Sequence, residues 1–135
     1  MRPRYLLLIF LYCGFIFWLS SQSRIPDPTL YFPGKDKVAH LALYTGLGFL
    51  ISWGRLRSRP DAGWVTLHLL PVLFVGFYGL SDEMHQRYVS NRTFDLFDLA
   101  ADVVGGLLAQ LILYFTVIRR AKNSGREETV CEIRG

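Results

Sequence analysis

The chain has 135 residues, 51% of them apolar, a formal net charge of +4 and a positive mean hydropathy. Its charge-free apolar runs are too long for a compact soluble bundle, which would lack the polar residues to cover its surface. The basic residues flank these runs, which is typical of membrane orientation signals and not of a nucleic-acid-binding groove. Composition therefore indicates a small integral membrane protein and excludes nucleic acid as a partner.

Four stretches lack charged residues, namely Tyr5 to Leu19, Leu41 to Trp53, Trp64 to Leu80 and Val103 to Ile118. A helix needs about 20 residues, within a range of roughly 17–25, to cross the apolar part of a bilayer. Each run reaches this length only if its polar flank continues the helix. We therefore expect an all-α bundle of four transmembrane helices, over residues 4–20, 37–54, 64–82 and 96–118.

The segments outside these helices are polar or rich in proline. Two arginines precede the first run, as in a signal peptide, but no small-x-small cleavage site follows, so a retained helix is expected. Residues 24–34 contain three prolines and are expected to form an ordered turn or an extended crossing. Residues 119–135 are expected to be a disordered cytoplasmic tail.

The basic residues between the helices predict the orientation. Eight lie on the side of the N-terminus: Arg2, Arg4, Arg55, Arg57, Arg59, Arg119, Arg120 and Lys122. Five lie on the opposite side, among acidic residues: Arg24, Lys35, Lys37, Arg87 and Arg92. Because cytoplasmic loops carry the excess of Lys and Arg, both termini are expected inside the cell. The loops over residues 21–36 and 81–94 are then outside.

The polar residues that interrupt the apolar pattern fall into three clusters, all at the outer end of the expected bundle. They are Asp36, Lys37 and His40 entering the second helix, Asp82, Glu83 and Gln86 leaving the third, and Arg92, Asp95, Asp98 and Asp102 entering the fourth. A random scatter would place polar residues at both ends. Their convergence is the main indication of a functional site.

Helical spacing places the acids of the fourth helix on one face. Asp95, Asp98 and Asp102 are three and four residues apart, and this face continues into small residues: Gly105 or Gly106, and Ala109. Small residues let helix backbones approach closely, so we expect this face to point into the bundle.

An ionisable residue at the depth of Asp102 indicates function and needs a partner, for which His40, Lys37 and Arg92 are available. Glu83, Asp98 and Asp102 would repel one another unless they shared a cation, a proton or a basic side chain. Groups in such a site can act as general acids or bases, so the catalytic candidates are His40, Glu83, Asp98 and Asp102.

Each feature also has a purely structural interpretation. His40 can hydrogen-bond Asp98 or a backbone carbonyl and fix the second helix against the fourth. Asp82 and Glu83 can form a hydrated helix end, and Asp95 can cap the fourth helix. A histidine and three carboxylates are chemically able to bind a metal, but no ligand pair of the HxxxH kind is present, so no metal is expected. No cofactor is expected either.

Several spaced motifs occur in a fixed order along the chain: Ser20-Ser21-Gln22, DKVAHLALYTGLGF (36–49), YGLSDEMHQRYVSNRTFDLFD (78–98) and LAADVVGG (99–106). With these motifs the sequence resembles the VanZ-like family of bacterial membrane proteins over roughly residues 5–118. The motif positions of the family coincide with the polar clusters. The resemblance therefore implies a ligand-binding set, namely Asp36, Lys37, His40, Asp82, Glu83, Gln86, Arg92, Asp98 and Asp102. Ser90-Asn91 stands where the family usually has Pro-Gly, which should alter the turn but not the cluster.

The resemblance implies a multi-pass protein of the bacterial cytoplasmic membrane with a role in the cell envelope. The family's namesake is an accessory factor in low-level resistance to teicoplanin, a lipid-anchored glycopeptide. The expected partners are membrane lipids and a lipid-linked cell-wall intermediate or a lipoglycopeptide.

Three functions stay open. One is a binding protein in which Arg92 and Lys37 contact a lipid phosphate. The second is a membrane-embedded hydrolase or transferase acting on a lipid or cell-wall precursor, with Glu83 or His40 as the base. The third is a structural accessory protein that acts by contact with a partner.

Overall fold

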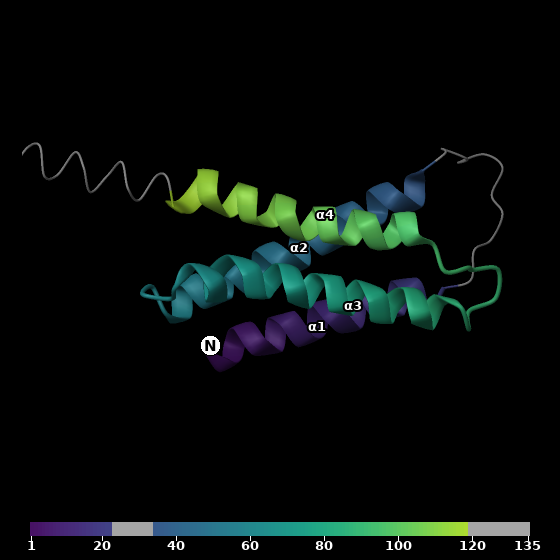
Figure 1. The fold of residues 1–135 in the computed structure, drawn as a ribbon. Helices are drawn as coiled ribbons and strands as arrows, with labels where there is room; N and C mark the ends of the chain where they lie inside the picture. The colour runs from purple at the N-terminus through teal and green to yellow at the C-terminus, as the bar shows by residue number, and fades with distance from the viewer. Residues whose placement is uncertain (23–33, 119–135) are drawn as a thin grey trace, which may run out of the picture.

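The computed structural model describes residues 1–22 and 34–118, which form an all-α bundle without strands (Figure 1). Its helices are α1 (Pro3–Ser20), α2 (Lys35–Ser58), α3 (Leu70–Gln86) and α4 (Leu96–Leu113). Two π-helical turns, η2 (Val65–Leu69) and η3 (Tyr114–Ile118), continue directly into α3 and out of α4. The crossing expected over 24–34, apart from Gly34, and the tail expected over 119–135 lie outside the described residues.

Two helices extend beyond the ranges expected from the apolar runs. α2 begins two residues earlier than 37–54 and runs four residues further, to Ser58, and α3 continues to Gln86 instead of ending at 82. In α2 the last turn suits the helix dipole, because Arg55 and Arg57 lie there, whereas the first turn holds Asp36 between Lys35 and Lys37. The added turns bring polar side chains onto the helical framework.

The helices run alternately up and down, so that the links gather at two ends (Figure 1). One end holds the N-terminus and the α2–η2 link, where the Arg2 backbone N–H donates to Ser58 Oγ at 2.9 Å. The other end, which we call the polar end, is formed by residues 20–22, 34–40 and 82–98. There Ser21 Oγ lies 3.1 Å from His85 Nε2 and joins the end of α1 to α3.

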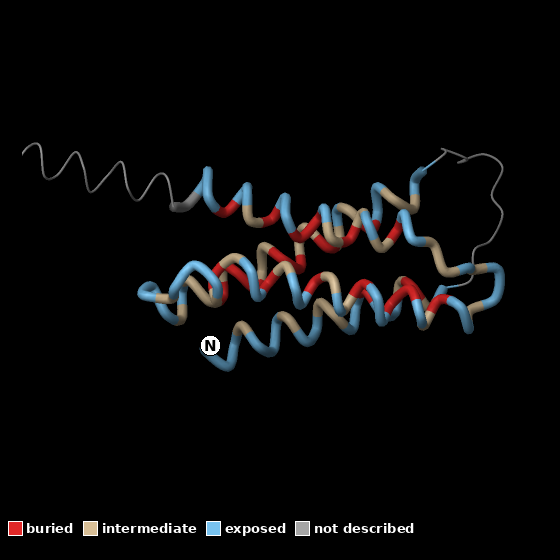
Figure 2. Tube along the Cα trace, viewed as in Figure 1, coloured by how far each residue is buried: buried red, intermediate tan, exposed pale blue. Residues whose placement is uncertain are grey.

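The core lies between α2, α3 and α4, whose facing sides carry most of the buried residues (Figure 2). On α4 the buried positions recur every three or four residues: Asp98, Asp102, Gly105, Gly106, Ala109 and Leu113. The expectation that the acidic and small face points into the bundle is therefore confirmed.

The outer surface of the bundle is apolar. α1 buries only Ile16 and Ser20, and Phe10 and Phe77 are 75% and 71% exposed. Such a surface suits lipid and would cause association in water. Three segments are long and apolar enough to cross a membrane: Pro3–Ser20, Val65–Gln86 and Leu96–Thr116. The described residues thus form an all-helical bundle with the surface and helix lengths of a membrane protein.

A polar contact lies within the apolar part of the bundle, between α2, η2 and α4. Gln110 Oε1 accepts from Ser52 Oγ at 3.1 Å and lies 3.1 Å from His68 Nδ1. His68 thus has a hydrogen-bond partner within the bundle, three residues before Pro71. Because Pro71 has no backbone N–H to donate to the preceding turn, the helix is π-helical directly before it.

Replacing Gly105 by alanine should lower the melting temperature in detergent. A Cβ at Gly105 would lie 2.8 Å from the Leu41 carbonyl oxygen and 2.9 Å from the Thr45 nitrogen, both backbone atoms of α2. Overpacking of this kind costs about 1–3 kcal/mol. Gly76→Ala is the matched control, because its Cβ would meet nothing nearer than Val103 Cγ2 at 3.6 Å. Equal melting temperatures for both variants would contradict close α2–α4 packing.

Candidate functional site

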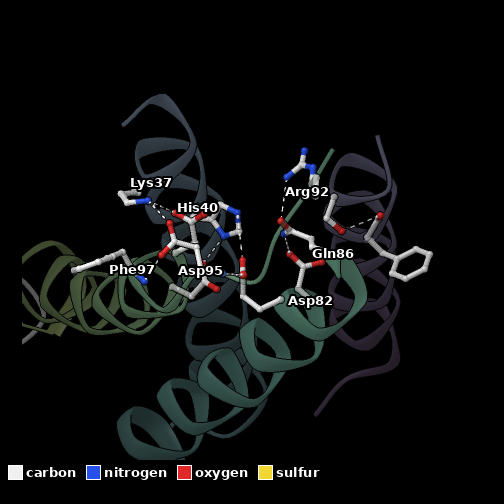
Figure 3. Close-up of polar contacts among 12 residues, drawn as sticks. Lys37, His40, Asp82, Gln86, Arg92, Asp95 and Phe97 are labelled. Atoms are coloured by element: carbon white, nitrogen blue, oxygen red, sulfur yellow. Dashed lines mark hydrogen bonds and ion pairs between the residues drawn. The ribbon is translucent and has the colours of Figure 1, made fainter. Parts of the chain in front are cut away.

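The polar end contains two groups of side-chain contacts (Figure 3). Lys37, His40 and Asp95 lie on one side of the view, and Asp82, Gln86 and Arg92 lie on the other. We call the first group the His40 cluster; its members are Lys37, His40, Glu83, Asp95, Asp98 and Asp102. The second is the Arg92 group; its members are Gln22, Asp82, Gln86 and Arg92.

His40 joins α2 to α4 through the deepest acid of the site. Its Nδ1 lies 2.9 Å from Asp102 Oδ1, and Asp102 is fully buried. The His40 ring also stacks on Tyr44, one turn further along α2, at 6.0 Å between ring centroids. His40 was one of the partners expected for Asp102, and the suggestion that it bonds Asp98 is wrong. Asp98 lies one turn nearer the helix start, level with Lys37.

Lys37 bridges the two acids at the beginning of α4. Its Nζ lies 2.7 Å from Asp95 Oδ2 and 3.0 Å from Asp98 Oδ1. Asp95 also caps α4, because its Oδ1 accepts the backbone N–H of Phe97 at 2.8 Å. The expected cap is confirmed. The sequence did not lead us to predict the pairing of Asp95 with Lys37. Its signal was that Asp95 caps the helix on the same face as the other acids.

Glu83, on α3, contacts the beginning of α4 and has no exposed surface. Its Oε2 accepts the backbone N–H of Asp95 at 2.9 Å, and its Oε1 lies 3.9 Å from His40 Nε2. Asp82 is also buried, at 4% exposed. The interpretation of these two acids as a hydrated helix end is therefore wrong.

The Arg92 group ties the loop after α3 to the ends of two helices. Gln86 Nε2 donates to Asp82 Oδ2 at 3.2 Å, and Arg92 Nη1 donates to Gln86 Oε1 at 3.2 Å. Arg92 Nε donates to the Gln22 carbonyl at 3.1 Å. Asn91, with φ 62°, occupies the left-handed region that asparagine tolerates better than most residues.

A cavity of about 460 Å³ adjoins this group and is lined by Arg87, Arg92, Thr93 and Phe94. Arg87 is a site residue that sequence analysis did not select, although it directly follows the motif residue Gln86. Asp36 lies in the first turn of α2, at the beginning of the polar end. The predicted site residues thus divide into a buried acid–base set and an arginine-lined rim.

The His40–Asp102 contact should be energetically coupled. Single His40→Ala and Asp102→Ala changes each leave a buried polar group without its partner, so the double variant should lose less stability than the two losses added together. A double-mutant cycle of unfolding in detergent should give a coupling of roughly 0.5–3 kcal/mol. The control cycle pairs His40→Ala with Gln110→Ala, at the other polar contact, and should be additive within about 0.5 kcal/mol. Additivity in the first cycle would contradict the pairing.

Comparison with known proteins agrees with these motifs. A family model described as VanZ/LLP1 matches residues 5–119. The chain is 36% identical over 85 residues to an uncharacterised protein of Schizosaccharomyces pombe, a match that covers 63% of this chain and half the length of that relative. No solved structure matches the chain. Since the family match covers nearly all of the helical bundle, the chain belongs to the VanZ/LLP1 family.

Proposed function

We propose that this membrane protein binds the phosphate of a lipid headgroup, or of a lipid-linked ligand, at the arginine-lined cavity of its polar end. The observation that carries the proposal is the placement of Arg87, Arg92 and Thr93 around one cavity of about 460 Å³. Guanidinium groups bind phosphate through paired N–H donors. Phe94 supplies an apolar wall suited to the adjoining glycerol or acyl part of a lipid.

Arg92 suits this role better than Lys37. Lys37 already contacts the carboxylates of Asp95 and Asp98, which neutralise its charge. Both described acceptors of Arg92 are neutral, the side-chain oxygen of Gln86 and a backbone carbonyl. These two contacts use two of the five N–H donors of a guanidinium group. Within the described part of the chain no carboxylate contacts Arg92, so its remaining donors and its charge are available to an anion.

We also propose that α2 spans the membrane as a fourth transmembrane helix, with both termini in the cytoplasm and the polar end outside. α2 has 24 residues, lies alongside the other helices and carries its charged residues at its two ends. It is less apolar than its neighbours because it packs mainly against protein instead of lipid. The excess of Lys and Arg on the N-terminal side supports this orientation.

In a bacterial cytoplasmic membrane, such a site would contact the outer leaflet and the ligands anchored there. We propose that the protein modulates susceptibility to teicoplanin by binding either this lipid-anchored glycopeptide or a lipid-linked cell-wall intermediate. A family relative in a fungus favours a ligand chemistry shared by both kinds of cell, and lipid phosphate meets that condition.

A second candidate function is that of a membrane-embedded hydrolase or transferase. The observation in its favour is the buried set in which His40 lies between Asp102 and Glu83. His40 oriented by Asp102 has the arrangement of a general base. Normal lipid and wall-precursor composition in a deletion strain carrying only Glu83→Gln would eliminate this candidate.

Arg92→Gln should reduce the occupancy of phosphatidylglycerol by about tenfold or more, which corresponds to the loss of one charge-assisted contact. Native mass spectrometry of the delipidated protein, titrated with phosphatidylglycerol, measures this occupancy, and inorganic phosphate tests whether the headgroup alone competes. Arg57→Gln is the control, because Arg57 lies near the end of α2, away from the polar end, over the Trp53 ring. Equal occupancy in wild type and Arg92→Gln would assign the polar end to helix packing.

The orientation of the protein in the membrane can be measured by labelling single cysteines. In a protein with Cys13→Ser and Cys131→Ser, an impermeant maleimide should label Ser90→Cys in intact cells and Asp61→Cys only after permeabilisation. Ser90 and Asp61 are both exposed and lie in links at opposite ends of the bundle. Labelling of Asp61→Cys in intact cells would contradict the proposed topology.

A further inference from the structure

Oε1 of Glu83 is a buried carboxylate oxygen that accepts no hydrogen bond within the described part of the chain. The side chain has no exposed surface, and Oε1 lies 3.9 Å from His40 Nε2, which is too far for a hydrogen bond. A buried charge of this kind is costly unless it is paired or coordinates a metal. A cation held in the gap between these two atoms would neutralise this carboxylate.

Asp102 determines which nitrogen of His40 faces that gap. With Asp102 ionised, its carboxylate only accepts hydrogen bonds, and the 2.9 Å contact then places a proton on Nδ1. Nε2 of the neutral ring then directs its lone pair toward the side of Glu83. Histidines that bind metals are oriented in this way, by a carboxylate that accepts a hydrogen bond from the second ring nitrogen.

Asp98 completes a set of three ligands from three helices. His40, Glu83 and Asp98 each offer one ligand atom, these atoms lie within 4.8 Å of one another, and all three residues are buried. Neighbouring ligand atoms on one ion stand roughly 3–4 Å apart, so a small movement of the side chains brings them to bonding distance. Lys37 contacts Asp98 Oδ1 at 3.0 Å but is shared with Asp95, so the cluster keeps a negative charge.

We propose that His40 Nε2, Glu83 and Asp98 bind one divalent transition-metal ion between α2, α3 and α4, with Asp102 orienting His40. One imidazole and two carboxylates suit Zn²⁺ or Mn²⁺. The ion would neutralise the carboxylates and join the three helices at the polar end. This proposal is independent of headgroup binding, which rests on Arg87 and Arg92.

The test uses the full-length protein in detergent, purified without a polyhistidine tag and stripped with EDTA. Zn²⁺ and Mn²⁺ are added separately, unbound ion is removed, and the metal content per chain is measured together with the melting temperature. Wild type should retain about one ion per chain and melt several degrees higher with metal. Glu83→Gln and Asp98→Asn should lose both the ion and the metal-dependent shift.

Two further variants separate metal binding from folding. Asp102→Asn should still fold and bind the ion with about 10–100-fold lower affinity, because it alters only the orientation of His40. His68→Gln should bind the ion like wild type, since His68 contacts Gln110 far from the cluster. If a variant fails to fold, the visible absorption of Co²⁺ bound to wild type and to His68→Gln reports the coordination instead. Less than about one ion per ten wild-type chains, or binding unchanged in Glu83→Gln and Asp98→Asn, overturns the proposal.

Discussion

The arrangement of this protein depends on one constraint, namely that charged groups enclosed by apolar helices must be neutralised by groups from neighbouring helices. The contact between His40 and Asp102 meets this constraint at the deepest point, and it is possible only because α2 and α4 approach closely at Gly105 and Gly48. Small residues and buried acids therefore occur on the same face of α4 for one reason. The small residues allow α2 and α4 to approach closely, and the buried acids need that approach to reach their partners.

The same constraint separates the polar end into an inner and an outer part. In the inner part, Glu83, Asp98 and Asp102 are buried and face His40 and Lys37, so they hold three helices at a fixed distance. In the outer part, Arg92 is held by neutral oxygens and shares a cavity with Arg87. A rigid inner set that supports a cationic rim is suited to recognising an anion at the membrane surface.

Much of this architecture follows from the sequence, because apolar runs and helical periods depend on local order along the chain. The inward face of α4 is predictable from the spacing of Asp98, Asp102 and Gly105. The partner of each charge is not predictable in this way, because it depends on how far one helix is shifted along another. Asp98 and Asp102 differ by only one turn. A ligand set drawn from three helices leaves no HxxxH pattern, and the position of Arg87 at the cavity depends on where α3 ends.

The most direct test of the claim that the polar end is the working part of the protein is teicoplanin tolerance in a susceptible Gram-positive host. Wild type is compared with Arg92→Gln and Glu83→Gln at matched abundance in the membrane. The account predicts that wild type raises tolerance and that both variants lose the increase. Variants that match wild type, or a wild type that leaves tolerance unchanged, would contradict it.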